Sequence, residues 1–486
     1  MSERAPSGAG PFRLSLEQQK KRAKELLAAV RAGDADALAR WNRHRPDGAT
    51  VCLATAQHVI ARELGLPSWP RLKAHVGAMN RARCAMGQGI PLDGACRTLH
   101  IRCGSDIRER LRDAGLTGDF LEYANPFCQG PVTGGPDLVD RRAAFLAASY
   151  GAALGVTAAD LRARLEREEA GLAAANTYDR VVLWFEHDGY DQLILARCLE
   201  RFAVLGPPPV LEMVALNHFP GSARFIGLGQ LPPEALHLLW AKRRVVPWAD
   251  CRVGQGVWQA LTAPEPDGLA ALLRQGFGGL PHMAAAVRRH LQELPGTADG
   301  LGLTQRLILM ALTERGCAAG DIWRVLVRET DPLPFLTDLM LWDMVGGLLG
   351  AADPAVTVDA PDAATTWPAR RLALTVAGRD VLAGRRDWLS CGPAERWVGG
   401  VPIRPGAPAR LWDEGAVAER SYYPSKNPVI PAAAPPPDRC GRGRWGRRPP
   451  CGGCGPPPPS PVRESGWLRA GFPNSAWACW SAALPG

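Results

Sequence analysis

The stretch "RVVLWFEHDGYDQLILARCLERFAVLGPPPVLEMVALN" (Arg180–Asn217) contains the pattern that decides the fold. Residues 180–186 are mostly β-branched and aromatic, and they predict a buried strand. Residues 189–203 carry apolar side chains at helical spacing, and residues 210–217 predict a second strand. A strand, a helix and a strand in this order indicate two strands joined by a crossover helix.

The same order occurs earlier in the chain. "LHIRC" (99–103) predicts a strand, "DIRERLRDAG" (106–115) a helix and "DFLEY" (119–123) a second strand. Two helices, at roughly 138–153 and 157–175, separate the two units. The repeated order predicts a Rossmann-like α/β layer with a partly parallel sheet.

The rest of the chain has other patterns. "AAVRAGDADALARW" (28–41) weakly resembles half an ankyrin repeat, although the usual Thr-Pro-Leu-His start does not precede it. After Leu303, three helices and a two-stranded ribbon follow in the order of a winged helix. We predict these regions: 1–13 disordered, 14–80 helical and weakly ankyrin-like, 98–230 Rossmann-like α/β, 231–300 a helical connector, 301–412 winged-helix-like, and 413–486 a disordered tail rich in Pro, Gly and Arg.

The composition is that of an ordinary globular protein with more than one core. The chain has 486 residues, of which 46% are hydrophobic and 22% charged. The thirteen cysteines follow no disulfide spacing, and no apolar stretch begins the chain, so we expect reduced thiols and a cytoplasmic location. The region after Trp412 supplies +4 of the formal net charge of +9. The rest of the chain therefore has only a small positive charge, which is weak evidence for nucleic-acid binding.

Several separate motifs resemble, in order, the bacterial domain-of-unknown-function family numbered 1835. They are "LHIRCGSDIRERLRDAG", "NPFCQGPV", "VVLWFEHDGYDQL", "NHFPGSARFIGLGQLPPEAL", "RRHLQELPGTADGLGLTQ" and "LTVAGRDVLAGRRDWLSCGPAERWVGG". The resemblance covers roughly residues 98–412, and it implies a shared fold and no particular reaction.

Four ionisable side chains follow the strand at 180–186, namely Glu186, His187, Asp188 and Asp191. In an open α/β sheet, ligands bind at the carboxyl ends of the strands. Because side chains alternate along a strand, Glu186 and Asp188 can share a face, where they could hold Mg²⁺ or Mn²⁺, with His187 as a proton carrier. The alternative is structural, since Asp188 followed by Asp191 is typical of a helix cap.

The loop "CGSDIRERLR" has the opposite charge preference. Gly104 and Ser105 precede a helix and Arg108 lies one turn along it, so backbone N–H groups, a hydroxyl and a guanidinium could bind an anion. The alternative is an ordinary capped helix with solvated arginines. If the two strands are adjacent and parallel, a nucleotide with its metal would satisfy this loop together with Glu186, Asp188 and Asp191.

Other motifs carry less chemistry. "FIGLGQL" (225–231) lacks the third glycine of a dinucleotide fingerprint and is interpreted as a turn. The third helix of the winged-helix-like region, Pro334–Leu349, has no Lys or Arg and carries Asp338 and Asp343. A DNA-reading helix needs basic side chains, so this face is better suited to contact with protein.

The sequence thus predicts a cytoplasmic regulatory or adaptor protein whose α/β domain binds a small nucleotide-like ligand. One alternative is a metal-dependent enzyme that processes phosphoesters or nucleotides, and a second is a winged-helix DNA-binding protein. We expect a protein partner, and a small anionic ligand is compatible with the sequence. Nucleic acid is the less favoured partner, and no membrane partner is expected.

Overall fold

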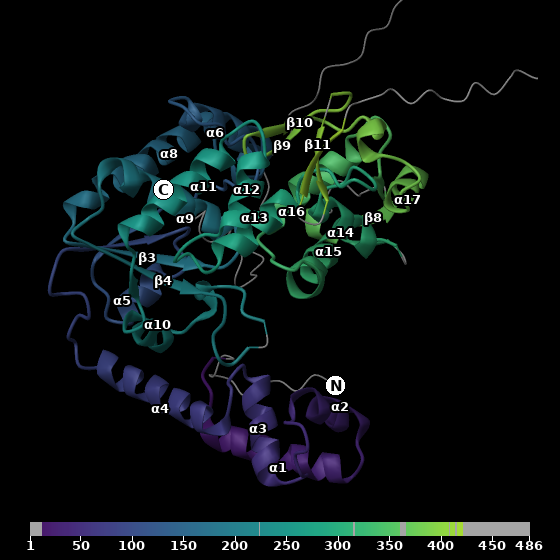
Figure 1. The fold of residues 1–486 in the computed structure, drawn as a ribbon. Helices are drawn as coiled ribbons and strands as arrows, with labels where there is room; N and C mark the ends of the chain where they lie inside the picture. The colour runs from purple at the N-terminus through teal and green to yellow at the C-terminus, as the bar shows by residue number, and fades with distance from the viewer. Residues whose placement is uncertain are drawn as a thin grey trace, which may run out of the picture. The chain divides into compact units, whose positions relative to one another are not determined.

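The computed structural model describes residues 12–222, 224–313, 316–359, 366–407, 409–413 and 416–420, the last range by its backbone alone. Within these ranges the protein is a mixed α/β protein with a mainly parallel sheet (Figure 1). The coarse fold class predicted from the sequence is therefore confirmed. Residues 1–11 and 421–486, for which we predicted disorder, lie outside the described residues.

The central sheet has five strands in the order β2-β1-β3-β4-β5. The strands are β1 (Thr98–Arg102), β2 (Asp119–Glu122), β3 (Arg180–Glu186), β4 (Val210–Leu216) and β5 (Arg244–Val245). The first four are parallel, and β5 runs antiparallel to β4 at the edge. Strands β1 and β3 are neighbours in register, with Ile101 opposite Leu183, so the loops that follow them leave the same edge of the sheet.

Alternation along β3 divides its side chains between two hydrophobic cores. Val181, Leu183 and Phe185 belong to the core that contains the inner faces of α9 (Gly189–Leu205) and α11 (Trp248–Leu261). Val182 and Trp184 belong to a second core, formed with α5 (Arg108–Asp113) and α10 (Pro233–Trp240). A strand buried on both faces has no polar side to show, which explains its continuous apolar run in the sequence.

Four N-terminal helices have a third core of their own, which includes Leu26, Trp41, Ile60 and Leu72. The helices are α1 (Leu16–Arg31), α2 (Ala35–His44), α3 (Leu53–Glu63) and α4 (Trp69–Met86). Helix α1 begins at Ser15, whose hydroxyl accepts a hydrogen bond from the backbone N–H of Gln18, as expected for a cap.

The C-terminal region combines helices with short antiparallel strands. Helices α14 (Leu303–Ala311), α15 (Ala319–Val325) and α16 (Asp338–Leu349) accompany a sheet of order β6-β8-β7, made of β6 (Cys317–Ala318), β7 (Val356–Val358) and β8 (Arg371–Leu374). Strand β11 (Ala409–Asp413) pairs with β12 (Ala416–Arg420). We predicted disorder after Trp412, but strand pairing continues to Arg420. The two strands form backbone hydrogen bonds with each other, which a search for hydrophobic periodicity does not detect.

The remaining elements connect these layers. They are α6 (Leu138–Leu146), α7 (Ala152–Leu154), α8 (Ala158–Ala173), α12 (Asp267–Gln275), α13 (Met283–Leu291), α17 (Val376–Leu382), β9 (Arg396–Val398), β10 (Val401–Ile403), the π-helical turns Ala147–Gly151 and Leu326–Thr330, and the 3₁₀ turns Ala174–Thr177, Leu228–Gln230, Trp367–Ala369 and Trp388–Cys391. No single helix in the described ranges has both the length and the apolar composition of a membrane span. The stretches Leu138–Leu154 and Ala158–Thr177 reach these limits only as a pair bent by 116°.

Candidate functional site

The acidic turn at the end of β3 is a helix cap. Asp188 has extended backbone angles (φ −79°, ψ 172°), and its Oδ1 accepts a hydrogen bond of 2.9 Å from the backbone N–H of Asp191. Both residues are placed where the partial positive charge at the start of α9 favours a carboxylate. The structural alternative considered for this turn is therefore confirmed, although a cap leaves most of the carboxylate oxygens free for other partners.

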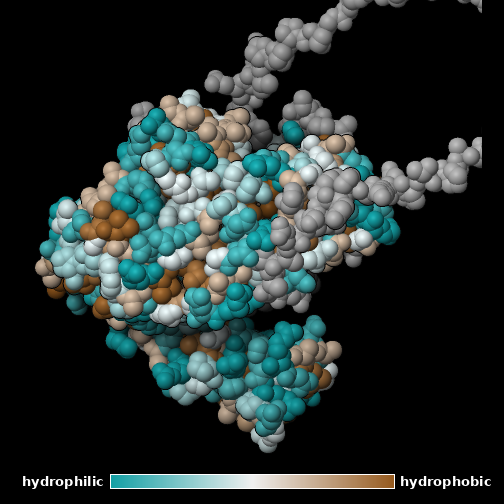
Figure 2. Space-filling model, turned by 45° about the horizontal axis from the view of Figure 1, so that its top comes forward, coloured by the Kyte–Doolittle hydropathy of each residue, from teal (hydrophilic) through white to brown (hydrophobic). Residues whose placement is uncertain are grey.

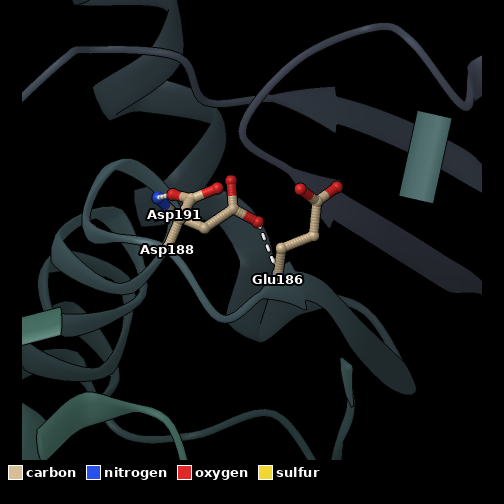
Figure 3. Close-up of side chains that lie close together, drawn as sticks. All are labelled: Glu186, Asp188 and Asp191. Carbon is tan, nitrogen blue, oxygen red and sulfur yellow. Dashed lines mark hydrogen bonds between the residues drawn. The ribbon is translucent and has the colours of Figure 1, made fainter. Parts of the chain in front are cut away.

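The turn also brings three carboxylates together. One oxygen from each of Glu186, Asp188 and Asp191 lies within 4.8 Å of the others, and the residues are only 5%, 9% and 2% exposed (Figure 3). Asp191 accepts a 2.5 Å hydrogen bond from the backbone N–H of Glu186, which fixes the end of β3 to the start of α9. Carboxylate oxygens at this spacing suit a hard divalent cation such as Mg²⁺ or Mn²⁺.

Arg102, the last residue of β1, lies among these carboxylates and was not predicted. Its Nη2 donates to Oε1 of Glu186, its Nη1 donates to Oδ2 of Asp191 at 2.5 Å, and its Nε donates to Oδ1 of Asp106 at 3.2 Å. The guanidinium is almost completely buried. We call Arg102 with Asp106, Glu186, Asp188 and Asp191 the acidic rim.

A loop after β4 covers the acidic rim. The backbone N–H of Leu228 donates a 2.6 Å hydrogen bond to Oε1 of Glu186. A Cβ atom at Gly227 would lie 2.5 Å from Oε2 of Glu186, and one at Gly229 would collide with the carboxylate of Asp106. The two glycines of "FIGLGQL" therefore let the backbone of this loop approach the carboxylates closely. We interpreted this motif as a turn from the sequence and did not predict that contact. We call residues 224–231 the cover loop.

The charges of the acidic rim do not balance. One guanidinium faces four carboxylates, and burial disfavours the ionised forms of Glu186 and Asp188. Burial, together with the neighbouring charge of Asp191, raises the pKa of Asp188 to about 8. Burial also raises the pKa of Glu186 well above its ordinary value, against the opposing effect of Arg102. Protons or a bound cation would each relieve the excess negative charge.

His187 lies outside the group of converging carboxylates. Its ring centroid is 6.3 Å from that of Phe225 and 6.3 Å from that of His282. Burial lowers the pKa of its imidazole, and Nδ1 is buried without a hydrogen-bond partner among the described residues. A neutral ring packed against other rings can carry a proton only if a substrate reaches it.

The predicted anion-binding residues are placed around the same edge of the sheet. Gly104 is buried and Ser105 is half-buried in the loop after β1, and the carbonyl of Ser105 accepts a 3.0 Å hydrogen bond from the backbone N–H of Arg108. The guanidinium of Arg108 lies 3.5 Å from the carboxylate of Glu122 and 4.9 Å above the ring of Phe120. This loop joins the acidic rim through Asp106, while Arg108 already has a carboxylate partner.

Comparison of the chain with known proteins identifies no related protein. No family model matches the chain, and no curated protein or solved structure is significantly similar to it. The resemblance to family 1835 therefore stays a prediction from its motifs.

Asp188→Asn tests the protonation of the acidic rim. In the unfolded chain an Asp has a pKa of about 3.9, whereas folded Asp188 has a pKa of about 8. The folded state thus binds more protons between these two values, and stability falls as the pH rises from about 4 to 8, with a maximum slope of about 1.4 kcal/mol per pH unit. Asn still caps a helix, so we expect the variant to lose less stability than the wild type between pH 5 and 8 in urea unfolding.

Asp188→Ala is the matched control for the cap. It removes the capping oxygen as well as the charge, and should lower stability by an additional amount of about 1 kcal/mol that does not depend on pH. Identical pH profiles for the wild type and Asp188→Asn would contradict a protonated Asp188 in the folded protein.

Proposed function

We propose that this protein is a regulatory or adaptor protein whose Rossmann-like α/β layer binds a divalent cation, together with a small nucleotide-like ligand, at the acidic rim. The unbalanced charge of four carboxylates around Arg102 supports a cation. The neighbouring loop with Gly104 and Ser105 supports an anionic group close to that cation.

A single set of contacts carries the proposal of a regulatory role. The cover loop is bonded to the acidic rim through the amide of Leu228, and Arg224 in the same loop donates hydrogen bonds of 2.7 Å and 2.8 Å to the carbonyls of Arg328 and Asp331. A cation that drew Glu186 away from Arg102 or Leu228 would shift the loop and the helical segment to which it is bonded. A binding event would thus be coupled to a second part of the chain, as regulation requires.

The C-terminal helices supply a surface for a protein partner. Helices α14, α15 and α16 with strands β6, β7 and β8 follow the order of a winged helix. Helix α16 has no Lys or Arg, while burial raises the pKa values of Asp338 and Asp343 on it. This charge distribution favours a protein over DNA as the partner of α16.

The described cysteines support a reducing compartment such as the cytoplasm. All nine of them, from Cys52 to Cys391, are free thiols. Secreted proteins of this cysteine content usually contain disulfides.

Calorimetry with Mn²⁺ and Mg²⁺, in the presence and absence of ADP, tests the proposal. We expect saturable Mn²⁺ binding by the wild type that weakens at least tenfold in Glu186→Gln. Hydrogen exchange should change at residues 224–231 and 326–331 when the cation binds, since these two segments are bonded to each other. Glu109→Gln is the matched control, because Glu109 is an exposed acid on α5 whose one ion pair within the described ranges is with Arg112 on the surface.

Three outcomes would separate the candidates. Binding without any change in exchange at residues 326–331 would remove the regulatory role, and the absence of binding under all conditions would remove the ligand site. Release of phosphate from ADP that depends on Mn²⁺ and is lost in Glu186→Gln would instead favour a metal-dependent enzyme. The convergence of Glu186, Asp188 and Asp191 within 4.8 Å is the observation that keeps that second candidate open.

A further inference from the structure

The basic charge of the chain is concentrated in the four N-terminal helices. Residues 12–86 contain fourteen Lys and Arg against six Asp and Glu, a formal charge of +8 in a chain whose total is +9. A high charge density on one small group of helices is the electrostatic footprint of a protein that binds a polyanion.

Most of this charge has no local counterpart. Six of the fourteen basic side chains pair with carboxylates, for example Arg40 with Glu63 and Arg83 with Glu234. The other eight are all exposed, and none makes an ion pair within the described ranges. They are Lys24, Arg31, Arg43, Arg45, Arg62, Arg71, Lys73 and Arg81.

These eight side chains come from all four helices and from the turn after α2. Six of the eight are arginines, whose planar guanidinium matches a phosphate group better than an ammonium does. Lys73 also lines a groove of about 720 Å³ beside Arg13 and Arg83, where Glu17 is the acidic side chain. The face seen in Figure 2 is largely hydrophilic over these helices.

The apolar side chains of the four helices are buried mostly in their own core, which contains Leu26, Trp41, Ile60 and Leu72, while Met79 of α4 is buried in the core with α10. Only Val51 and Leu53 among the large apolar residues of this segment are exposed. Insertion into a lipid surface needs a free apolar face, and a charged surface without one suits a solvated phosphate backbone.

We infer that the four N-terminal helices form a binding surface for the phosphate backbone of nucleic acid, without sequence preference. Arg71, Lys73 and Arg81 on α4, with the five basic side chains of the preceding helices, are the groups that contact phosphates. The inference is independent of the acidic rim and of the proposed function. It assigns nucleic-acid binding to a different part of the chain from the winged-helix-like region.

Fluorescence anisotropy with the full chain and labelled 20-base-pair DNA and RNA duplexes tests this surface. Binding should weaken with salt, with a slope of log K against log[salt] of about −4 to −7 for five to eight phosphate contacts. In a variant with Lys24, Arg62, Arg71 and Arg81 each changed to Gln, the affinity should fall at least tenfold and the magnitude of the slope should fall by about 3.6. The melting temperature should stay within a few degrees, because all four side chains are exposed.

A second variant removes the same charge elsewhere. It changes Arg167, Arg252, Arg274 and Arg288 to Gln, which are also exposed and make no ion pair among the described residues. It should keep wild-type affinity. Equal losses in the two variants, unchanged binding by the first, or no binding by the wild type would each overturn the inference. So would preferential binding to phosphatidylserine vesicles or to poly-glutamate over the duplexes.

Discussion

Arg102→Met lowers the free energy of unfolding by about 3–5 kcal/mol, because it leaves buried carboxylates without their cation. The guanidinium contacts Glu186, Asp191 and Asp106, and the side chains of Arg102, Glu186 and Asp191 are at most 6% exposed. Methionine has a similar length and preserves the packing, so the loss of stability measures the contribution of the guanidinium charge. Urea unfolding at pH 7 measures it.

The pH dependence of this loss identifies its cause. Burial raises the pKa of Glu186, so protonation neutralises this partner of Arg102 at low pH, and the loss should be smaller at pH 5 than at pH 8. Adding Glu186→Gln to Arg102→Met should recover part of the stability. Arg112→Met is the matched control, since Arg112 is 64% exposed and, among the described residues, pairs only with Glu109 on the surface, where a pair contributes no more than about 0.5 kcal/mol. A loss at Arg102 as small as that at Arg112 would show that the acidic rim does not depend on it.

Arg289→Met has the second large effect, and we expect a loss of about 3–5 kcal/mol. Arg289 on α13 donates two hydrogen bonds to Asp331, of 2.9 Å and 2.8 Å, one of 2.5 Å to Glu293 and one of 2.8 Å to Thr304. Arg289 and Asp331 are each 2% exposed. The variant leaves two buried acids unpaired, and urea unfolding measures the cost.

The same change should also loosen the segment to which the cover loop is bonded. Asp331 accepts from Arg224 through its carbonyl and from Arg289 through its carboxylate. Hydrogen exchange at residues 326–331 should therefore become faster in Arg289→Met. Arg288→Met changes the exposed neighbour on the same helix and should alter neither stability nor exchange. Unchanged exchange in Arg289→Met would show that the segment is held by other contacts.

Most elements of the α/β layer could be predicted from the sequence. The run at 180–186, the helix that begins after Asp188 and the strand at Val210 all lie where their patterns indicated. These elements follow from local rules, since β-branched runs, helical spacing and a capping aspartate each act over a few residues. The loop after β1 and the acidic turn could also be assigned to one edge, because consecutive parallel units place their carboxyl ends together.

Arg102 could have been found by a stricter use of alternation. Leu99 and Ile101 belong to one core, so His100 and Arg102 face the other side of β1. Glu186 faces that same side of β3, two residues after Trp184. A buried arginine requires a carboxylate, and Glu186 was the available one at the same edge. The basic N-terminal segment could also have been found from the sequence. Counting the net charge of each segment separately identifies residues 12–86 as strongly basic, whereas the net charge of the whole chain does not show where the basic residues lie.

The sequence by itself determined the main strands and helices of the α/β layer, where α9 is capped, and that acids gather at the end of β3. Only the tertiary structure decided what those acids contact. Arg102, the amide of Leu228 and the close approach of Gly227 come from strands and loops far apart in the chain. The physical reason is that caps and periodicity depend on neighbours in sequence, whereas the partner of a buried charge is set by which loops the sheet order places side by side.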